Sequence, residues 1–394
     1  MIRAADFYHA RRGLSTRLSL AWALAWLLSM PDDAIAQTRS LATQPNAIRL
    51  ADRPACAACR LLVRHIATLG TDSLDGYLSD NPLWASMDQH GVIYVGLQPP
   101  GGPLLSFDTT GRFLGRIGGR GRGPGEFQLP VSAVPASSGR LLIWDFSGAQ
   151  LTVLDSARRF QYRVYQPYSP VGAFADGRQL VSAPMTGSDG HWYTLHIYDD
   201  SGKRVDSFGR AARGYAEPER WRLVRRASIG PRGTIWAADA DRYVVNEWSM
   251  EGQELRTFFR SVVWMPPVEV RSAGVFGERP NAHVVALVED ESRRLWVFSR
   301  VPATDWQSAL GPATVSRGRA SFPRRDQGRL FDTMVDVIDL GSDRLIVSER
   351  VAGNVRFVLS PDPIVVRYRE KEDGTPLLDV LRISMQATDP GRNP

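Results

Sequence analysis

The sequence has almost no lysine and no long helix-forming run. Lys203 and Lys371 are the only lysines among 48 basic residues, so nearly all of the positive charge is arginine. The arginines are scattered along the chain among 42 acids, and the formal net charge is +6. Without a basic block or a stacking platform, this charge does not indicate a nucleic-acid partner. The absence of long runs rich in Ala, Glu, Lys and Leu excludes a mainly helical fold, while 35 glycines and 26 prolines indicate many turns.

Cysteine is equally scarce, since Cys56 and Cys59, in a CAAC motif, are the only two. A closed zinc site needs four ligands, and there is no second cysteine pair to supply them. Haem attachment needs a histidine directly after the second cysteine, where Arg60 stands. A thioredoxin-like redox motif would follow a strand in a βαβ unit, which the sequence does not show. We therefore expect a structural disulfide between Cys56 and Cys59, with little entropic stabilisation from so short a loop.

The N-terminal region has the pattern of an export signal. Arg11, Arg12 and Arg17 precede an apolar run at 18–28, and a small-x-small motif ends at Ala36. The run is shorter than the ~20 residues that span a bilayer, so we expect a signal peptide at 1–36 rather than a transmembrane helix. An uncleaved anchor is the alternative. The mature chain is expected to be periplasmic or secreted, with no transmembrane span, and monomeric.

A unit of short β-type runs recurs along the chain. The first copy reads GVIYVG at 91–96 with LLSFDTTGRFLGRIG at 104–118, and the second reads GRLLIWD at 139–145 with LTVLDSARRFQYRVY at 151–165. Four further copies follow, and one more apolar run precedes each copy. Every unit thus offers four short strands joined by tight turns such as Asp-Thr-Thr-Gly.

Four antiparallel strands per repeat, six times over, predict an all-β fold, a six-bladed β-propeller at 60–386. We expect an N-terminal segment at 37–59 before it, an insertion at about 300–330 and a flexible tail at 387–394. The last copy lacks an outer strand, whereas RLLVRHIATLG at 60–70 is a spare run before the first copy. We predict that Leu61 to Thr68 completes the sixth blade and closes the ring.

The glycine-rich stretch GRFLGRIGGRGRGPGEFQLPVSAV at 111–134 fits no phosphate-binding loop, because neither the Walker A nor the dinucleotide spacing is present and no helix follows. We expect 118–128 to cross from the rim of the first blade to the axis of the second. In this crossing, Phe127 is expected to wedge between blades and Glu126 to accept main-chain donors. The stretch, followed by GRLLIWDFSGAQLTVLD, resembles the NHL-repeat branch of six-bladed β-propellers. The resemblance implies a fold more than an activity, because members include binding proteins, sensor domains and a few lyases and lactonases.

The sequence marks few residues for function. His283 and Asn281 lie where an inner strand begins, although an ordinary, partly buried histidine is the alternative for His283. Four arginines could form a basic rim that binds an anionic ligand: Arg120, Arg122, Arg225 and Arg226. The alternative is that these arginines are solvated and pair with nearby acids. A calcium or magnesium ion at the axis would need oxygen or nitrogen ligands, and the candidates are Asp88, Asp176, Asn281, His283 and Glu289. The spacing of these residues does not mark a metal site. Asp88 and Asp176 stand where turns begin, which is typical of Asx-turns.

No catalytic motif such as Gly-x-Ser-x-Gly is present. We therefore expect a non-catalytic, exported propeller that binds a protein, peptide or glycan through the loops around its central channel, without a cofactor. A metal-dependent lyase or lactonase of the same fold is the alternative.

Overall fold

The computed structural model describes residues 44–71, 76–79, 81–98, 102–211, 223–240, 242–266, 279–310, 314–316, 319–321, 328–359 and 362–387. Residues 46–394 form one compact unit. The expected signal peptide and all but the first residue of the expected tail lie outside the described residues. In the described part of the chain, no helix is long and apolar enough to span a membrane.

The first three blades are consecutive four-stranded antiparallel sheets. Blade 1 contains β3 (Pro82–Met87), β4 (Ile93–Leu97), β5 (Leu104–Phe107) and β6 (Phe113–Ile117). Blade 2 contains β9 (Pro130–Pro135), β10 (Leu141–Asp145), β11 (Gln150–Leu154) and β12 (Phe160–Tyr165). Blade 3 contains β13 (Pro170–Ala173), β14 (Gln179–Thr186), β15 (Trp192–Tyr198) and β16 (Arg204–Arg210).

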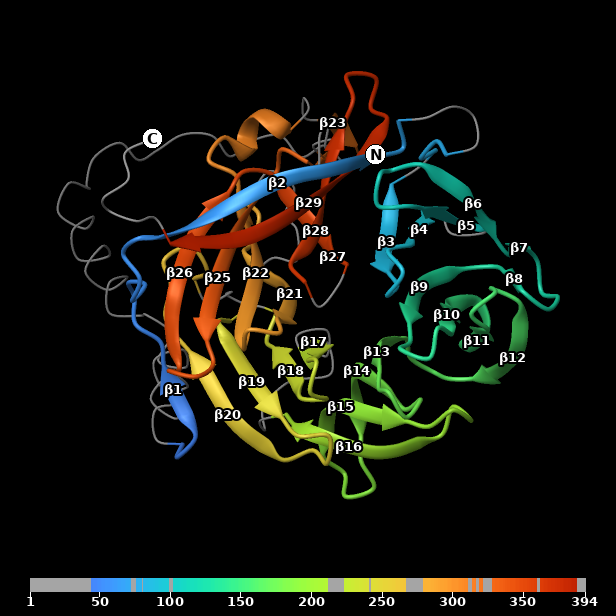
Figure 1. The fold of residues 1–394 in the computed structure, drawn as a ribbon, viewed down its shortest axis with the longest axis horizontal. Helices are drawn as coiled ribbons and strands as arrows, with labels where there is room; N and C mark the ends of the chain where they lie inside the picture. Colours follow the sequence, from blue (N-terminus) through green and yellow to red (C-terminus); the bar gives the residue numbers. More distant parts are fainter. Residues whose placement is uncertain are drawn as a thin grey trace, which may run out of the picture. The chain divides into compact units, whose positions relative to one another are not determined.

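The other three blades repeat this arrangement. Blade 4 contains β17 (Arg226–Ile229), β18 (Ile235–Ala238), β19 (Val244–Trp248) and β20 (Glu254–Phe259). Blade 5 contains β21 (His283–Glu289), β22 (Arg294–Pro302), β25 (Phe331–Asp339) and β26 (Arg344–Val351). Blade 6 contains β27 (Asn354–Val358), β28 (Ile364–Glu370), β29 (Pro376–Ala387) and β2 (Cys59–Leu69). The inner strands β3, β9, β13, β17, β21 and β27 contact one another in a ring, which Figure 1 shows in face view, so the predicted six-bladed propeller is confirmed.

The ring is closed as predicted. β2 pairs antiparallel with β29 over its whole length, from Cys59 opposite Ala387 to Leu69 opposite Leu378, with one irregularity between His65 and Ala67. The outer strand of blade 6 therefore comes from near the start of the chain and the other three strands come from its end. Leu69 is completely buried, so this closure also contributes to the core.

The segment before β2 continues along the outside of two more blades. β1 (Ala47–Arg49) adds in parallel to β20, the outer strand of blade 4. Ala55 N then donates to Leu345 O on blade 5 at 2.8 Å. The predicted disulfide joins Cys56 to Cys59, with an S–S distance of 2.01 Å, and Cys59 packs in an apolar cluster with Val347. The sequence did not indicate β1 or its parallel pairing.

Most hairpin turns share one chemistry, in which an aspartate starts the turn. Asp108 Oδ1, for example, accepts from Thr110 N at 2.9 Å and from Arg112 N at 3.0 Å. The fourth residue of the turn is left-handed, as in Gly111 (φ 87°), which suits glycine. In blade 2 this position is Arg158 (φ 63°), whose guanidinium reaches back to Asp88 Oδ2 of blade 1 at 2.6 Å. The residue with the strained backbone, Arg158, therefore also forms an ion pair between blades 1 and 2.

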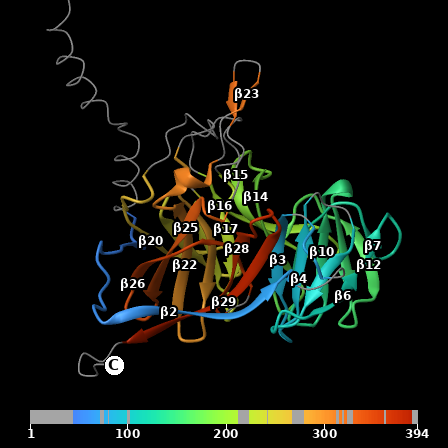
Figure 2. The same ribbon diagram turned by 90° about the horizontal axis from the view of Figure 1, so that it is seen from above.

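The glycine-rich crossing from blade 1 to blade 2 is confirmed. Phe127 is fully buried between the blades, and Gly123 N donates to Glu126 Oε2 at 2.8 Å. A Cβ on Gly118 would lie 2.3 Å from the Phe127 ring, so only glycine fits there. The expected insertion lies between β22 and β25 and carries a short hairpin, β23 (Thr314–Ser316) with β24 (Arg319–Ser321), which extends away from the ring in Figure 2.

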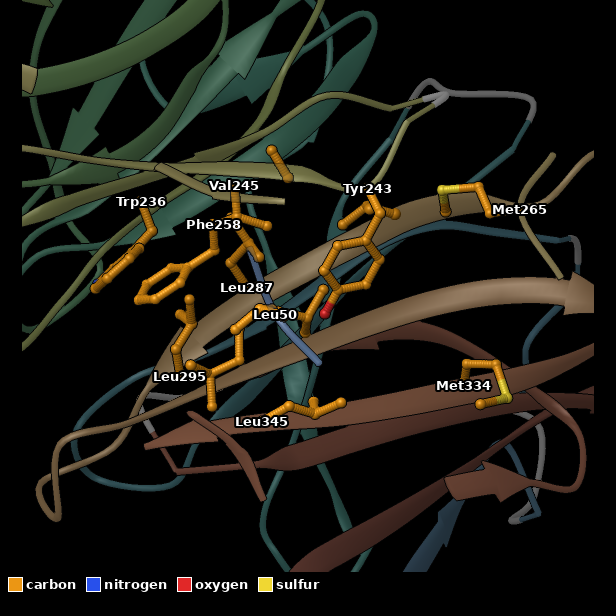
Figure 3. Packing of buried hydrophobic residues seen from close by; sticks show 14 of the residues in the cluster. Leu50, Trp236, Tyr243, Val245, Phe258, Met265, Leu287, Leu295, Met334 and Leu345 are labelled. Carbon is orange, nitrogen blue, oxygen red and sulfur yellow. The ribbon is translucent and has the colours of Figure 1, made fainter. Parts of the chain in front are cut away.

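The core consists of apolar clusters between neighbouring blades. Figure 3 shows the cluster between blades 4 and 5, where Trp236 and Phe258 face Leu287 and Leu295. Leu50, just after β1, is also buried in it. The N-terminal segment is therefore part of the core rather than an added tail.

A buried ion pair crosses the same boundary between blades 4 and 5. Arg260 Nη2 lies 2.5 Å from Asp336 Oδ2, and their side chains are 2% and 1% exposed. The guanidinium also stacks on the ring of Tyr243, 4.8 Å from its centroid. Each of these two charges is stabilised mainly by the other, because water cannot reach the site to replace the ion pair if one partner is removed.

We expect Asp336→Ala to lower the free energy of unfolding by about 3–5 kcal/mol, because it leaves the Arg260 charge buried and unpaired. Replacing both residues with apolar ones, Arg260→Met with Asp336→Leu, should cost clearly less. Arg112→Ala, in an exposed pair with Asp108, is the control and should cost less than about 1 kcal/mol. Urea unfolding measures all three, and equal costs for Asp336→Ala and Arg112→Ala would contradict the account.

Candidate functional site

All six inner strands begin on one face of the ring, which we call the entry face. On this face, the loop that connects the second and third strands of a blade lies next to the start of an inner strand. Phe146 N, after β10, donates to Leu129 O, before β9, at 2.9 Å. Likewise, Tyr368 Oη near the end of β28 lies 2.5 Å from Asn81 Oδ1, directly before β3. Side chains from different blades therefore converge here around the axis.

Four basic side chains of blades 4, 5 and 6 gather on the entry face, and we call them the cation cluster. Arg226 is the first residue of β17 and His283 the first of β21. Arg300 lies near the end of β22, directly opposite His283 in the strand register. Arg356 is the third residue of β27. Arg300 and Arg226 disfavour a positive charge on His283, and Arg356 and Arg226 disfavour the charge on Arg300.

Aromatic rings and backbone carbonyls hold these cations. The Arg300 guanidinium lies over Phe331, 5.9 Å from the ring centroid, and its Nε is 3.4 Å from Val355 O of blade 6. Arg356 lies over the Tyr368 ring at 5.0 Å, and its buried Nη1 has no hydrogen-bond partner among the described residues. The His283 ring meets Phe331 edge-on at 6.0 Å.

The protein environment destabilises the charged forms of the whole cluster. Burial, followed by repulsion from Arg356 and Arg226, lowers the pKa of Arg300 to about 10. Burial and the charges of Arg300 and Arg226 lower the pKa of His283 to about 4, so His283 is neutral at pH 7. Burial also lowers the pKa of Arg226 and Arg356. Arg226 is nevertheless exposed to solvent.

The nearby acids of the entry face do not neutralise this charge. No carboxylate in the described part of the chain lies within 4.0 Å of the guanidinium of Arg226, Arg300 or Arg356. Glu370 favours the charge on Arg356 from a greater distance, and Tyr368 Oη lies 2.7 Å from the Glu370 carboxylate. Glu370 thus offsets part of the charge on Arg356, whereas no acid acts in this way on Arg226 or Arg300 in the described part of the chain.

Other acids of this face have cationic or backbone partners of their own. Asp239 pairs with Arg225 at 3.2 Å and with Arg242 at 2.5 Å. Asp332 pairs with Arg350 at 2.9 Å. These carboxylates are occupied in fixing the loops and strands that carry them.

The structure brings together some of the predicted site residues and separates others. Arg226 and His283 belong to the cation cluster, and the exposed Asn281 offers its backbone oxygen, 3.3 Å from His283 Nδ1. Arg225 does not belong to it, because its guanidinium binds Asp239 and Asn246. Arg120 and Arg122 are exposed on the crossing loop between blades 1 and 2, whose β7 (Gly119–Arg120) lies at the rim in Figure 1.

Sequence reasoning missed Arg300 and Arg356. Each is an arginine inside a mostly apolar strand, RLWVFSRVP in β22 and NVRFV in β27. A charged residue inside such a run was the available signal, because burying an unpaired charge is costly and strands rarely carry one without a purpose.

The aspartates weighed as metal ligands have structural roles, as the Asx-turn alternative predicted. Asp88 Oδ1 accepts from His90 N at 2.9 Å, and Asp176 Oδ1 accepts from Arg178 N at 3.0 Å. Glu289 is buried and accepts from Trp236 Nε1 at 2.8 Å and from Thr234 Oγ1 at 3.0 Å. Among the described residues there is no group of three or more His, Cys, Asp or Glu side chains that could hold a metal ion.

No protein-family description and no curated protein sequence matches this chain. Solved structures do share its fold. A Bacteroides vulgatus member of the DUF4221 family is 11% identical with a TM-score of 0.55, covering 83% of this chain and 99% of its own. A Bacteroides fragilis protein described as exported is 13% identical with a TM-score of 0.52, covering 86% and 99%. A virginiamycin B lyase from Staphylococcus aureus, at 8% identity over 82% of this chain and 99% of its own, has a TM-score of 0.36, which is too low to support an argument about activity. At these identities the likeness shows the fold alone, and it does not confirm the NHL resemblance.

We expect His283 to weaken the fold in acid. Its folded pKa of about 4 lies below the usual 6.5, so its contribution to stability is complete above pH 6.5 and is lost as the pH falls toward 4. His283→Gln, which cannot take up a proton, should flatten the stability profile between pH 6.5 and 4, by up to about 3 kcal/mol. His90→Gln, at an exposed position, is the control for urea unfolding at several pH values. Identical acid profiles for wild type and His283→Gln would contradict the environment described for this ring.

Proposed function

We propose that this protein is an exported binding propeller that captures an anionic ligand on its entry face, through the cation cluster, without catalysing a reaction. The observation that carries this proposal is the set of three guanidinium groups, from three blades, with no carboxylate within salt-bridge distance in the described part of the chain. A protein that places like charges together reduces its own stability. A ligand that brings the missing negative charge offsets this cost.

The chemistry of the cluster suits binding. Guanidinium groups present fixed forks of donors that match carboxylate, sulfate and phosphate oxygens and do not release their protons at neutral pH. Arg300 and Arg356 are oriented by the rings of Phe331 and Tyr368, so little side-chain freedom remains to be lost when an anion binds. Neutral His283 adds a donor or an acceptor beside them.

Export is the setting that best fits the rest of the chain. The signal-like pattern with its site after Ala36 precedes a chain whose two cysteines are joined, and disulfides persist in oxidising compartments. A structure of the same fold is described as an exported protein. We propose a monomeric mature protein in the periplasm or outside the cell.

Isothermal titration with inorganic pyrophosphate tests the site directly. We expect wild-type protein to bind it at low ionic strength and to lose affinity as salt is added. Arg300→Gln should weaken binding by about 10- to 100-fold, because it removes a charge-assisted hydrogen-bond donor. Arg159→Gln, an exposed residue in the turn of blade 2 paired with Asp155, is the matched control and should bind as wild type does.

The melting temperature of the same variants separates binding from a structural role. If Arg300 serves a ligand, Arg300→Gln relieves repulsion and the free protein melts no lower than wild type. A clear drop in melting temperature, or unchanged pyrophosphate affinity, would contradict the proposed function.

A further inference from the structure

The chain runs from the rim toward the axis between outer strand β12 of blade 2 and inner strand β13 of blade 3, and it carries exposed aromatic side chains there. Tyr165, at the end of outer strand β12, is 69% exposed, and Tyr168, in the connection to β13, is 37% exposed. Val171, at the start of inner strand β13, follows with 40%. Phe146, on the connection between β10 and β11, is 60% exposed beside them. We call Phe146, Tyr165 and Tyr168 the aromatic row.

Backbone contacts fix the row in place. Gln166 N donates to Ala149 O at 2.8 Å, which joins the segment of Tyr165 and Tyr168 to the loop of Phe146. Trp144 reinforces this junction, since its Nε1 donates to Gln166 O at 2.8 Å and its ring meets Phe146 edge-on at 5.8 Å. The rings are therefore exposed on an ordered support.

A further arginine lies at the outer side of this loop. Arg122 Nε donates to Gln128 Oε1 at 3.0 Å, and Ser147 Oγ, next to Phe146, donates to the same oxygen at 2.9 Å. The partner of Arg122 is thus neutral, and its side chain is exposed. Exposed positive charge therefore lies beside Phe146 of the aromatic row, and the cation cluster lies on blades 4, 5 and 6 of the same entry face.

The surroundings of the rings favour a carbohydrate over a protein partner. Ser147 and Gly148 are exposed beside Phe146, and Ser169 is partly exposed beside Tyr168, so small residues flank these two rings. A protein interface concentrates its anchors in a desolvated apolar centre with a polar rim. Separate rings with polar groups between them suit sugar rings, whose C–H faces pack on aromatic faces while their hydroxyls keep hydrogen-bonding partners.

We propose that the ligand of the entry face is an acidic oligosaccharide, with sugar rings stacked on the aromatic row and carboxylate or sulfate groups bound by Arg122 and the cation cluster. This inference rests on the proposed anion-binding function and specifies its ligand. An extended chain fits because the row crosses from rim to axis, whereas a small anion would need the cation cluster alone.

The test titrates the purified chain with hexagalacturonate, with a sulfated heparin hexasaccharide and with neutral maltohexaose. We expect at least one acidic hexamer to bind and the neutral one to bind at least tenfold more weakly. The double variant Phe146→Ala with Tyr168→Ala should weaken binding of the acidic hexamer about tenfold, through the loss of two stacking contacts, and leave pyrophosphate affinity unchanged. Phe160→Ala, at another exposed ring of β12, is the matched control and should change neither affinity.

The outcomes distinguish this inference from the proposed function. Pyrophosphate binding without binding of either acidic hexamer overturns the oligosaccharide and leaves the anion site standing. Absence of both kinds of binding overturns both. Acidic-hexamer binding that the double variant does not weaken overturns the role of the aromatic row. A hexaglutamate peptide that binds as tightly as the sugars, with the same dependence on Phe146 and Tyr168, assigns the face to acidic peptides instead.

Discussion

The pairing of β2 with β29 is the constraint on which the rest of the structure depends. It supplies the outer strand of blade 6 from residues that precede blade 1, so residues 59–69 and 378–387 are joined in one antiparallel ladder with a single irregularity. Without it, blade 6 would keep three strands and an open edge, and Leu69 would leave the cluster between blades 6 and 1. The ring would then no longer hold all of its inner strands at one axis.

A closed ring explains how the protein tolerates its own charge distribution. Arg226, Arg300 and Arg356 belong to three separate blades, and only the packing of those blades brings Arg226 and Arg356 within electrostatic range of Arg300. Elsewhere between the blades, arginines are matched with acids, as in the Arg260–Asp336 and Arg158–Asp88 pairs. Arginines at the blade boundaries are paired with acids, whereas those of the cation cluster are not. This contrast is the reason why we place the candidate site on the entry face.

Much of the fold could be predicted because it is encoded locally. Turns of the Asp-x-x-Gly type mark the hairpins, and counting strands showed that the last copy lacked one, which identified 61–68 as the closing strand.

The site was only partly predictable. Arg225 and Arg226 look equivalent in sequence, but Arg225, just before β17, pairs with Asp239, whereas Arg226, the first residue of β17, acts on His283 and Arg300. Arg300 and Arg356 are 56 residues apart and meet only after two sheets form. Strand β1 has only three residues, too few for a pattern of apolar and polar positions that would predict a strand or its parallel pairing with β20.

Amide hydrogen exchange followed by mass spectrometry tests the closure most directly. If β2 closes the ring, its amides bonded to β29 exchange as slowly as those of β28, because both strands belong to one cooperative sheet. Fast exchange throughout 59–69, while β28 and β29 remain protected, would show that the ring is not closed by this strand and would contradict the architecture on which the entry face depends.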